Sequence, residues 1–281
     1  MKMSNAEVQP NIPAFARDGR AIEMGRSGGC IAIDCTNEEY HSDTGTLSCS
    51  LMKKLLRSPA HYQASLVAER TETPSQRIGS AIHCAWLEPV RFASEYTVYD
   101  DRRGTKAYKT FEEANPGKII LNSKEMRAVE GASLALENFL DLPLGQFRAE
   151  GQAEKSIYFT DEKTGLTVRS RPDLMHPSVT LELKSTDDAR PYAFKKQVNR
   201  LDYDLQAYIC LQAVRRLTGK VLPFAFVAVE TDEPHGVWIH NVVSEEIIDS
   251  GHLKFRRACD TYARALASGN WTSYSRPVSE L

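Results

Sequence analysis

The sequence predicts an α/β protein with a mixed central β-sheet flanked by helices. Three observations support this fold class. Capped, amphipathic segments between residues 48 and 140 are typical of helices, and residues 153–186 alternate as short strands separated by turns. Residues 221–230 are almost continuously apolar and are followed by another helical pattern, which is typical of a central strand buried on both faces.

Composition excludes several classes of protein. The chain has 281 residues, a formal net charge of −2 and a pI near 6.4, so it lacks the overall basic charge of a protein that coats nucleic acid. No apolar run is long enough to span a membrane, and no signal peptide is recognisable. Its six cysteines form no C-x-x-C pair, so we expect reduced thiols in a cytoplasmic protein rather than disulfides or a zinc or iron–sulfur cage.

The chain divides into two unequal parts. Residues 1–45 contain Pro13, Gly19 and the Gly28-Gly29 pair, which interrupt any helical or strand period. We therefore expect a poorly ordered N-terminal arm over residues 1–45 and a single domain over residues 46–281.

The domain begins with predicted helices. Ser48 is placed to cap the first, and a second is expected after Pro59. A third helix is expected between Pro74 and Pro89, where small residues allow close packing against a sheet. It carries His83 beside its apolar stripe. From the local pattern alone, a lone histidine there is more often a hydrogen-bonded boundary residue than a metal ligand.

A basic segment follows at residues 101–109. Four basic side chains and one tyrosine surround a glycine, a combination that suits a phosphate backbone and a stacked base. An ordinary mobile surface loop is an equally good interpretation. The candidate DNA-binding residues are Arg102, Arg103, Lys106, Tyr108 and Lys109. A short strand at 119–121 and a helix capped by Asn122 and Glu125 come next.

Residues 153–186 form the part of the sequence that carries chemistry. We expect three strands joined by turns, with Glu154 opening the first, Asp173 closing the second, and Glu182 and Lys184 within the third. Because strand side chains alternate, Glu182 and Lys184 share one face, and the leucines beside them point toward a core.

Acidic oxygens from neighbouring strands form a hard oxygen site that suits Mg²⁺ or Mn²⁺. A lysine two residues beyond one ligand can reach the attacking water or the scissile phosphate and stabilise developing charge there. Pro172-Asp173 with Glu182-Leu183-Lys184 fits the P-D…(D/E)-x-K pattern of nucleases. The pattern is short, and a hairpin with a surface ion pair is the alternative that it leaves open.

The last third is expected to hold a long helix over 202–217, strands over 221–230 and 237–243, and a final helix that begins after Ser244. Gln206 lies early on the long helix and could point back toward the acidic residues.

Taken in order, these motifs show that the chain resembles the exodeoxyribonuclease VIII-like branch of the P-D…(D/E)-x-K nucleases, whose wider relatives include lambda exonuclease and the RecB-type nuclease domains. The resemblance covers about residues 47–274 and implies a restriction-endonuclease-like core. It rests on several segments: Ser58-Pro59-Ala60-His61-Tyr62, Ile78-Gly79-Ser80-Ala81-Ile82-His83, Leu87-Glu88-Pro89, Arg103-Gly104-Thr105-Lys106, Glu154, Arg171-Pro172-Asp173 and Glu182-Leu183-Lys184.

The resemblance assigns roles to the site residues. It implies that His83, Asp173, Glu182 and the Leu183 carbonyl hold the metal, reversing the local expectation for the histidine. It makes Lys184 the residue that acts on the attacking water and Glu154 the first acid of the site. Gln206 matches the glutamine of a Q-x-x-x-Y helix, but Cys210 stands where that pattern has tyrosine, so the resemblance carries Gln206 only weakly.

The implied function is a Mg²⁺-dependent exodeoxyribonuclease, for which Mn²⁺ substitutes. The resemblance implies 5′-to-3′ degradation of linear double-stranded DNA in phage or prophage recombination, by a homo-oligomer that works with a single-strand annealing recombinase. Four further interpretations stay open: an endonuclease, a nuclease acting on RNA or single strands at the same site, a DNA-binding protein with a degenerate site, and a plain cytoplasmic α/β protein whose acids form surface ion pairs.

Overall fold

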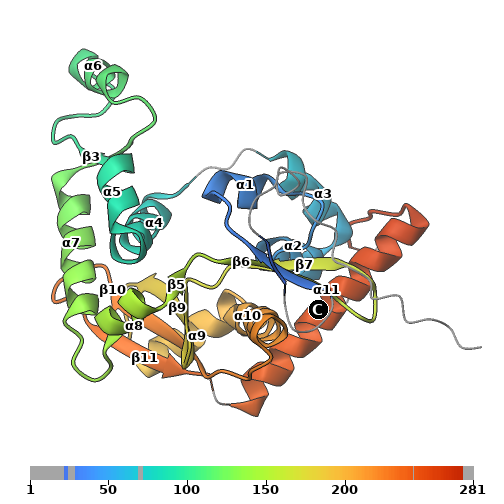
Figure 1. Cartoon of the computed structure of the whole chain (residues 1–281). Coiled ribbons are helices and arrows are strands. Elements are labelled where there is room, and N and C mark those ends of the chain that lie inside the picture. Colours follow the sequence, from blue (N-terminus) through green and yellow to red (C-terminus); the bar gives the residue numbers. More distant parts are fainter. Residues whose placement is uncertain (1–21, 25–28, 69–71, 243, 275–281) are drawn as a thin grey trace, which may run out of the picture.

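The computed structural model describes residues 22–24, 29–68, 72–242 and 244–274 (Figure 1). A five-stranded mixed sheet lies at its centre, in the order β11-β10-β9-β8-β5. The pair β9 and β10 is parallel, and the other neighbours are antiparallel. The fold class predicted from the sequence is therefore confirmed. The strands are β5 (Gln152–Ala153), β8 (Leu174–His176), β9 (Val179–Thr186), β10 (Phe224–Glu230) and β11 (Val237–Asn241).

A four-stranded antiparallel sheet lies beside the central one, in the order β1-β2-β6-β7. A parallel pair, β3 with β4, stands apart from both. These strands are β1 (Ile22–Met24), β2 (Cys30–Ile33), β6 (Ser156–Thr160), β7 (Thr167–Ser170), β3 (Tyr96–Val98) and β4 (Ile119–Leu121).

Helices cover both faces of the central sheet. The long helices expected from the sequence are present: α2 (Cys49–Arg57), α3 (Pro59–Val67), α4 (Pro74–Leu87), α7 (Ser123–Glu137), α10 (Tyr203–Thr218) and α11 (Glu245–Ser268). Ser48 caps α2, and Asn122 with Glu125 forms the expected capping box of α7. The remaining helices are α1 (Asn37–Ser42), α5 (Pro89–Glu95), α6 (Lys106–Ala114), α8 (Leu144–Glu150) and α9 (Pro191–Arg200).

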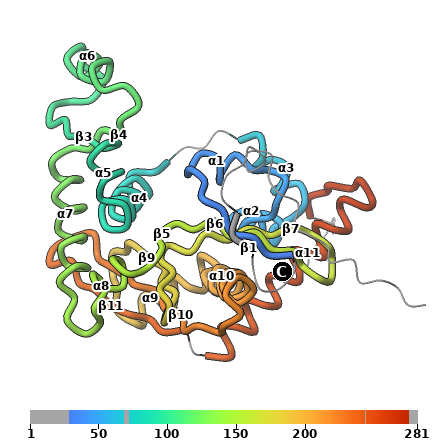
Figure 2. The backbone as a smooth tube through the Cα atoms, in the orientation of Figure 1, coloured from blue at the N-terminus to red at the C-terminus, as the bar shows by residue number. Residues whose placement is uncertain are grey.

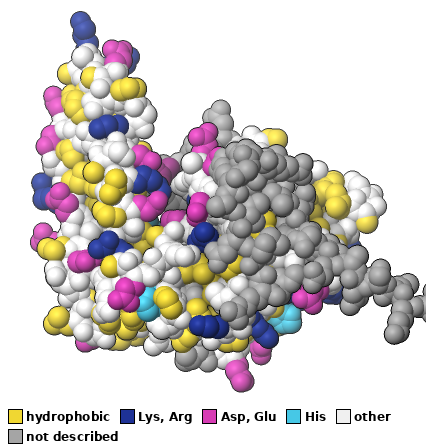
Figure 3. Space-filling view, viewed as in Figure 1, with side chains coloured by type: hydrophobic (Ala, Val, Ile, Leu, Met, Phe, Trp, Pro, Cys, Tyr) yellow, Lys and Arg dark blue, Asp and Glu magenta, His cyan; other side chains and the backbone are white. Residues whose placement is uncertain are grey.

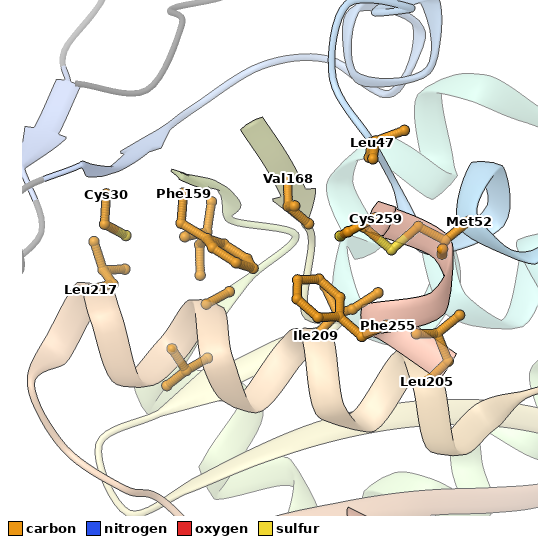
Figure 4. Packing of buried hydrophobic residues seen from close by; sticks show 14 of the residues in the cluster. Cys30, Leu47, Met52, Phe159, Val168, Leu205, Ile209, Leu217, Phe255 and Cys259 are labelled. Atoms are coloured by element: carbon orange, nitrogen blue, oxygen red, sulfur yellow. The ribbon is translucent and has the colours of Figure 1, made fainter. Parts of the chain in front are cut away.

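Helix α10 packs between the two larger sheets. Leu205 and Ile209 on one side pack against Phe159 and Val168 of the four-stranded sheet, as Figure 4 shows. On the other side, its buried residues pack against α9 and β10. The opposite face of the central sheet packs against α4 and α7, and its buried residues include both leucines that flank Glu182. The apolar pattern thus fixes which face of β9 remains for polar chemistry.

Part of the predicted N-terminal arm is ordered. Of residues 1–45, the first 21 and residues 25–28 lie outside the described chain, but residues 30–33 form β2, which is buried between β1 and β6. Thr36 caps α1 through a complete capping box. Within the expected arm, residues 30–33 and 37–42 thus form a strand and a helix, and a four-residue buried strand is too short to show a period in the sequence.

The structure also differs from the three-strand meander that the sequence predicts. Its middle strand is divided into β7 and β8, which belong to different sheets. Pro172 lies at the break, where a residue without an N–H cannot continue a ladder. The chain therefore leaves one sheet after Ser170 and enters the other at Leu174, with Asp173 at the crossing.

The basic segment is only partly a loop. Thr105 caps α6, so Lys106, Tyr108 and Lys109 lie on a helix, whereas the loop expectation holds for residues 102–105. Together with α5, β3 and β4, helix α6 builds an arm that projects from the body (Figure 1, Figure 2). Helices α5 and α8, of seven residues each, were not foreseen.

Arg169 joins the N-terminal segment to β7, and its contacts allow a prediction about stability. Its side chain is 2% exposed, pairs with Asp43 at 3.2 Å and donates to the Thr46 carbonyl at 2.9 Å. We expect Arg169→Met to destabilise the protein by about 3–5 kcal/mol, because it leaves a buried carboxylate without its partner. Lys163→Met, which breaks an exposed pair with Asp260, should cost less than about 1 kcal/mol.

The two free energies of unfolding are compared by urea denaturation followed by circular dichroism. Equal small losses in both variants would show that the Arg169 pair does not hold the N-terminal segment.

Candidate active site

Strand β9 presents Glu182 and Lys184 on one face. Glu182 is 1% exposed, and its Oε2 atom accepts a hydrogen bond from Lys184 Nζ at 3.1 Å. The parallel partner β10 holds this part of β9 extended, with Glu182 opposite Phe226 and Lys184 opposite Ala228. The acid and the lysine are therefore held side by side by sheet register.

Asp173 is fixed at the crossing between the sheets. Its Oδ2 atom accepts a hydrogen bond from the Leu183 N–H at 2.7 Å, so the strand that carries Glu182 also orients this carboxylate. Its carbonyl accepts the N–H of Glu154 at 3.2 Å. Glu154 has a left-handed backbone, with φ of 53°, which is uncommon for a residue with a side chain and is frequent at functional sites.

Helix α4 brings His83 to the acids. Its Nδ1 atom lies 3.6 Å from Asp173 Oδ2. The close approach depends on Gly79, one turn earlier, because a Cβ there would lie only 2.7 Å from Ser185 Oγ. Ligand atoms of His83, Glu154 and Asp173 all lie within 4.8 Å of one another, so these three residues could hold a metal ion.

Charges in the site perturb one another. Burial, and then the negative charge of Asp173, raise the pKa values of Glu154 and Glu182, and burial likewise raises the pKa of Asp173. Burial, and then the positive charge of Lys184, lower the pKa of His83 to about 4, so its imidazole is neutral at neutral pH. A neutral imidazole beside crowded carboxylates is a suitable donor set for a divalent cation, whose positive charge would offset the repulsion among the carboxylates.

Glu182 has a different set of partners. Besides Lys184, its Oε2 atom accepts a hydrogen bond from Gln206 Nε2 at 2.6 Å, and Cys210 Sγ lies 3.7 Å from Oε1. Although burial alone would lower the pKa of Lys184, the negative charges of Glu182 and Asp173 raise it, so the lysine is an ammonium. Gln206 therefore does face the acidic residues, and Cys210, one helical turn later, contacts the same carboxylate.

The resemblance implies His83, Asp173, Glu182 and the Leu183 carbonyl as metal ligands, with Glu154 touching the metal shell. His83, Asp173 and Glu154 lie close enough together to hold an ion. Glu182 bonds to Lys184 and Gln206, and its pKa is raised by burial and by the nearby charge of Asp173. The Leu183 N–H bonds to Asp173, and the ligand set itself stays a prediction.

Two residues near the site were missed. Arg171 donates to Ser156 Oγ at 2.8 Å and to the Cys35 carbonyl at 3.0 Å, and its Nε atom lies 3.9 Å from Glu154 Oε2. Tyr203 lies beneath Lys184, whose Nζ atom is 5.2 Å from the ring centroid. Position gives a signal for both, because Arg171 precedes Pro172-Asp173 and Tyr203 lies three residues before Gln206 on one helix face.

The site opens into a cavity of about 1770 Å³. Its walls come from α1, α2, α4 and α5, and its floor holds Glu154, Asp173 and Glu182 together with Gln206. Part of one wall is the N-terminal segment from Asp34 to His41. The cavity is large enough to admit a polymer segment rather than a small molecule alone.

The predicted DNA-binding residues lie on the projecting arm. Arg103 is tied down there, since it pairs with Glu125 at 3.1 Å and donates to the Ile120 carbonyl at 2.8 Å. Tyr108 packs edge-on against Tyr99. Arg102, Lys106 and Lys109 are exposed, and Figure 3 shows basic and acidic side chains mixed along the arm.

Among the described helices, none is both long and apolar enough to cross a membrane.

Comparisons with known proteins agree with this geometry. Residues 48–278 match the family described as "PDDEXK-like domain of unknown function (DUF3799)". The crystal structure of a "putative exonuclease" from Eubacterium rectale is similar with a TM-score of 0.58 and 16% identity, covering 84% of this chain and 88% of that chain, which shows the fold alone. An alignment with the crystal structure of SSO0001 covers 74% of this chain and 84% of that chain at 10% identity, and its TM-score of 0.28 is too low to show a shared fold. A comparison with curated proteins finds no match.

The family match includes His83, Glu154, Asp173, Glu182 and Lys184 and extends over most of the chain. The protein therefore belongs to the family of PDDEXK-like domains.

Proposed function

We propose that the protein is a metal-dependent deoxyribonuclease that hydrolyses phosphodiester bonds of linear double-stranded DNA from the 5′ end. One observation carries the proposal: Asp173 and Glu182 line a large cavity together with His83 and Glu154, and Lys184 bonds to the Glu182 carboxylate. The fold, shared with a protein that is itself described as a "putative exonuclease", supports an assignment within the nucleases.

The donor set fits a divalent cation. His83, Glu154 and Asp173 would hold it, with Glu182 and the Leu183 carbonyl at the edge of the same site. Hard oxygen donors favour Mg²⁺, with Mn²⁺ as a substitute. Bound there, the cation supplies positive charge that polarises the scissile phosphate and lowers the pKa of water.

The chain's own groups supply the rest of the chemistry. Lys184 is a half-buried ammonium that is held by Glu182 and has the Tyr203 ring beside it, so its charge is preorganised next to the acids. It would orient the attacking water and stabilise charge on the phosphate oxygens. Gln206 holds the Glu182 carboxylate in the orientation that keeps Lys184 in place.

Further details of the function are also proposals. The products would carry 5′ phosphates and leave a 3′ single strand, which suits a recombination step with a single-strand annealing partner. A homo-oligomer that surrounds the duplex would give processivity, and phage or prophage recombination is the setting that fits. Arg102, Arg103, Lys106, Tyr108 and Lys109 on the projecting arm are candidate DNA contacts.

The role of Lys184 gives the first test. Lys184→Ala should reduce Mg²⁺-dependent hydrolysis of linear duplex DNA at least about 100-fold. The variant lacks the ammonium group that would stabilise the negative charge developing on the scissile phosphate. Lys220→Ala removes an exposed lysine and serves as the control. Loss of fluorescence from labelled DNA measures the rate. Undiminished turnover in Lys184→Ala contradicts the mechanism, and DNA binding without any turnover in the wild type would indicate a degenerate site.

Metal binding can be measured without DNA. Asp173→Asn should weaken Mn²⁺ binding at least about tenfold in isothermal titration calorimetry, because it removes a central charged ligand. Asp101→Asn, on the exposed loop of the arm, is a matched control that should bind as the wild type does. Equal Mn²⁺ affinities for the wild type, Asp173→Asn and Asp101→Asn would show that Asp173 is not a ligand of the bound ion.

End dependence separates the proposed exonuclease from an endonuclease and from a nuclease acting on single strands or RNA. Linear duplex labelled at its 5′ ends should release label from the earliest time points, whereas 3′ label should stay on long fragments until late. Covalently closed duplex should remain intact, because it offers no end. Nicking of the closed circle would favour an endonuclease. Faster degradation of single-stranded DNA or RNA than of linear duplex would favour a nuclease specific for those substrates.

A further inference from the structure

Helices α2 and α9 each contain three basic residues and no acids. Helix α2 (CSLMKKLLR) and helix α9 (PYAFKKQVNR) include no Asp or Glu, although the whole chain has 37 acidic residues and a net charge of −2. Such a local excess of positive charge differs from the mixed charges of the arm, where α6 (KAYKTFEEA) carries two acids with its two lysines.

The basic residues of α9 lie on one exposed face. Tyr192, Lys195, Lys196, Asn199 and Arg200 are all exposed and follow the spacing i, i+3, i+4, i+7, i+8. The opposite face is anchored by two buried residues, Phe194 and Val198. The exposed face is therefore held rigidly, which lowers the entropy cost of using it for binding.

Helix α2 continues this surface into the catalytic cavity. Lys53 and Lys54 line the cavity, and Lys53 Nζ donates a hydrogen bond to the carbonyl of Leu201, directly after α9. We define the basic ridge as Lys53, Lys54, Lys195, Lys196 and Arg200. In the described part of the chain, none of the exposed members pairs with an acid.

Tyr203 connects the ridge to the catalytic lysine. Lys53 Nζ lies 5.6 Å from the ring centroid and Lys184 Nζ lies 5.2 Å from it. Two acids that flank α9 along the chain are already paired, Asp188 with Arg190 at 2.7 Å and Asp202 with Lys254 at 2.6 Å. The charge of the ridge is therefore not cancelled where it meets the site.

Other walls of the cavity carry acids. Asp34 and Glu38 lie on the N-terminal segment, and Glu72, Glu88 and Glu95 lie on or next to α4 and α5. Asp34 pairs with Lys155 at 3.2 Å, and Glu88 and Glu95 both pair with Arg91, so much of the charge on these walls is compensated locally. In the described part of the chain, no acid forms an ion pair with Lys53 or Lys54 on α2. The uncompensated charge of the cavity thus favours a path for a polyanion from the metal site past Lys53 and onto α9.

We propose that the basic ridge binds the phosphate backbone of the DNA strand that is being cleaved, leading it along α2 and α9 to the site. This inference rests on the proposed function and adds the surface through which the substrate is held. It differs from the arm residues expected from the sequence, because it places the main contacts beside Lys184.

Binding to a fluorescein-labelled linear duplex, measured by fluorescence anisotropy in EDTA over a series of KCl concentrations, tests the inference. The ridge variant is Lys195→Gln/Lys196→Gln/Arg200→Gln. The matched control variant, Lys118→Gln/Arg215→Gln/Lys220→Gln, loses the same three charges at exposed positions that do not line the cavity. Unchanged thermal unfolding checks that both variants fold.

The ridge variant should bind at least about tenfold more weakly at moderate salt. The negative slope of log K against log [KCl] should become shallower by about 2.7, which corresponds to three lost phosphate contacts. The control variant should change affinity less than about twofold. Unchanged binding by the ridge variant, equal losses in both variants, or a wild type without salt-dependent binding would each overturn the inference.

The experiment distinguishes this inference from the proposed function. A wild type that binds DNA through the ridge but hydrolyses none of it with Mg²⁺ would overturn the nuclease assignment and leave the ridge in place. A wild type that degrades linear duplex, while the ridge variant binds and degrades it equally well, would overturn the ridge alone.

Discussion

Repulsion among crowded carboxylates is the constraint on which the rest of the site depends. Glu182 is buried, and the half-buried Glu154 and Asp173 lie near it, where burial and like charges raise the cost of ionisation. The fold holds them there by strong local means: the Leu183 N–H fixes Asp173, and Lys184 and Gln206 fix Glu182. Groups kept together against their own repulsion are typical of a site that is completed by a cation.

The N-terminal segment completes one side of this site. Arg171, beside Asp173, bonds to the Cys35 carbonyl and lies over the Tyr40 ring, with its Cζ atom 4.1 Å from the centroid. The same guanidinium lies close to Glu154. Residues 30–43 precede the matched family segment, which begins at residue 48, yet they form a wall of the cavity. The metal site and this wall are therefore joined through one arginine.

Sequence reasoning succeeded where a local pattern determines the outcome. Alternation predicted that Glu182 and Lys184 share a face of β9, and caps at Ser48 and Asn122 predicted two helix starts. It did not succeed where long-range packing determines the structure. The left-handed backbone of Glu154 and the break at Pro172, which send chain segments to different sheets, were not predicted. A local sequence period cannot predict that the chain crosses from one sheet to another.

The charge distribution explains why a net charge of −2 says little about DNA binding here. Acids cluster in the proposed metal site, whereas α2 and α9 contain none. Over a Debye length of about 8 Å at physiological salt, a phosphate near Lys196 would be influenced by its immediate neighbours and hardly by the rest of the molecule. The sum over the chain therefore hides a separation of charge. In the proposed function, that separation would lead a polyanion along the basic ridge to the acids that hold the cation.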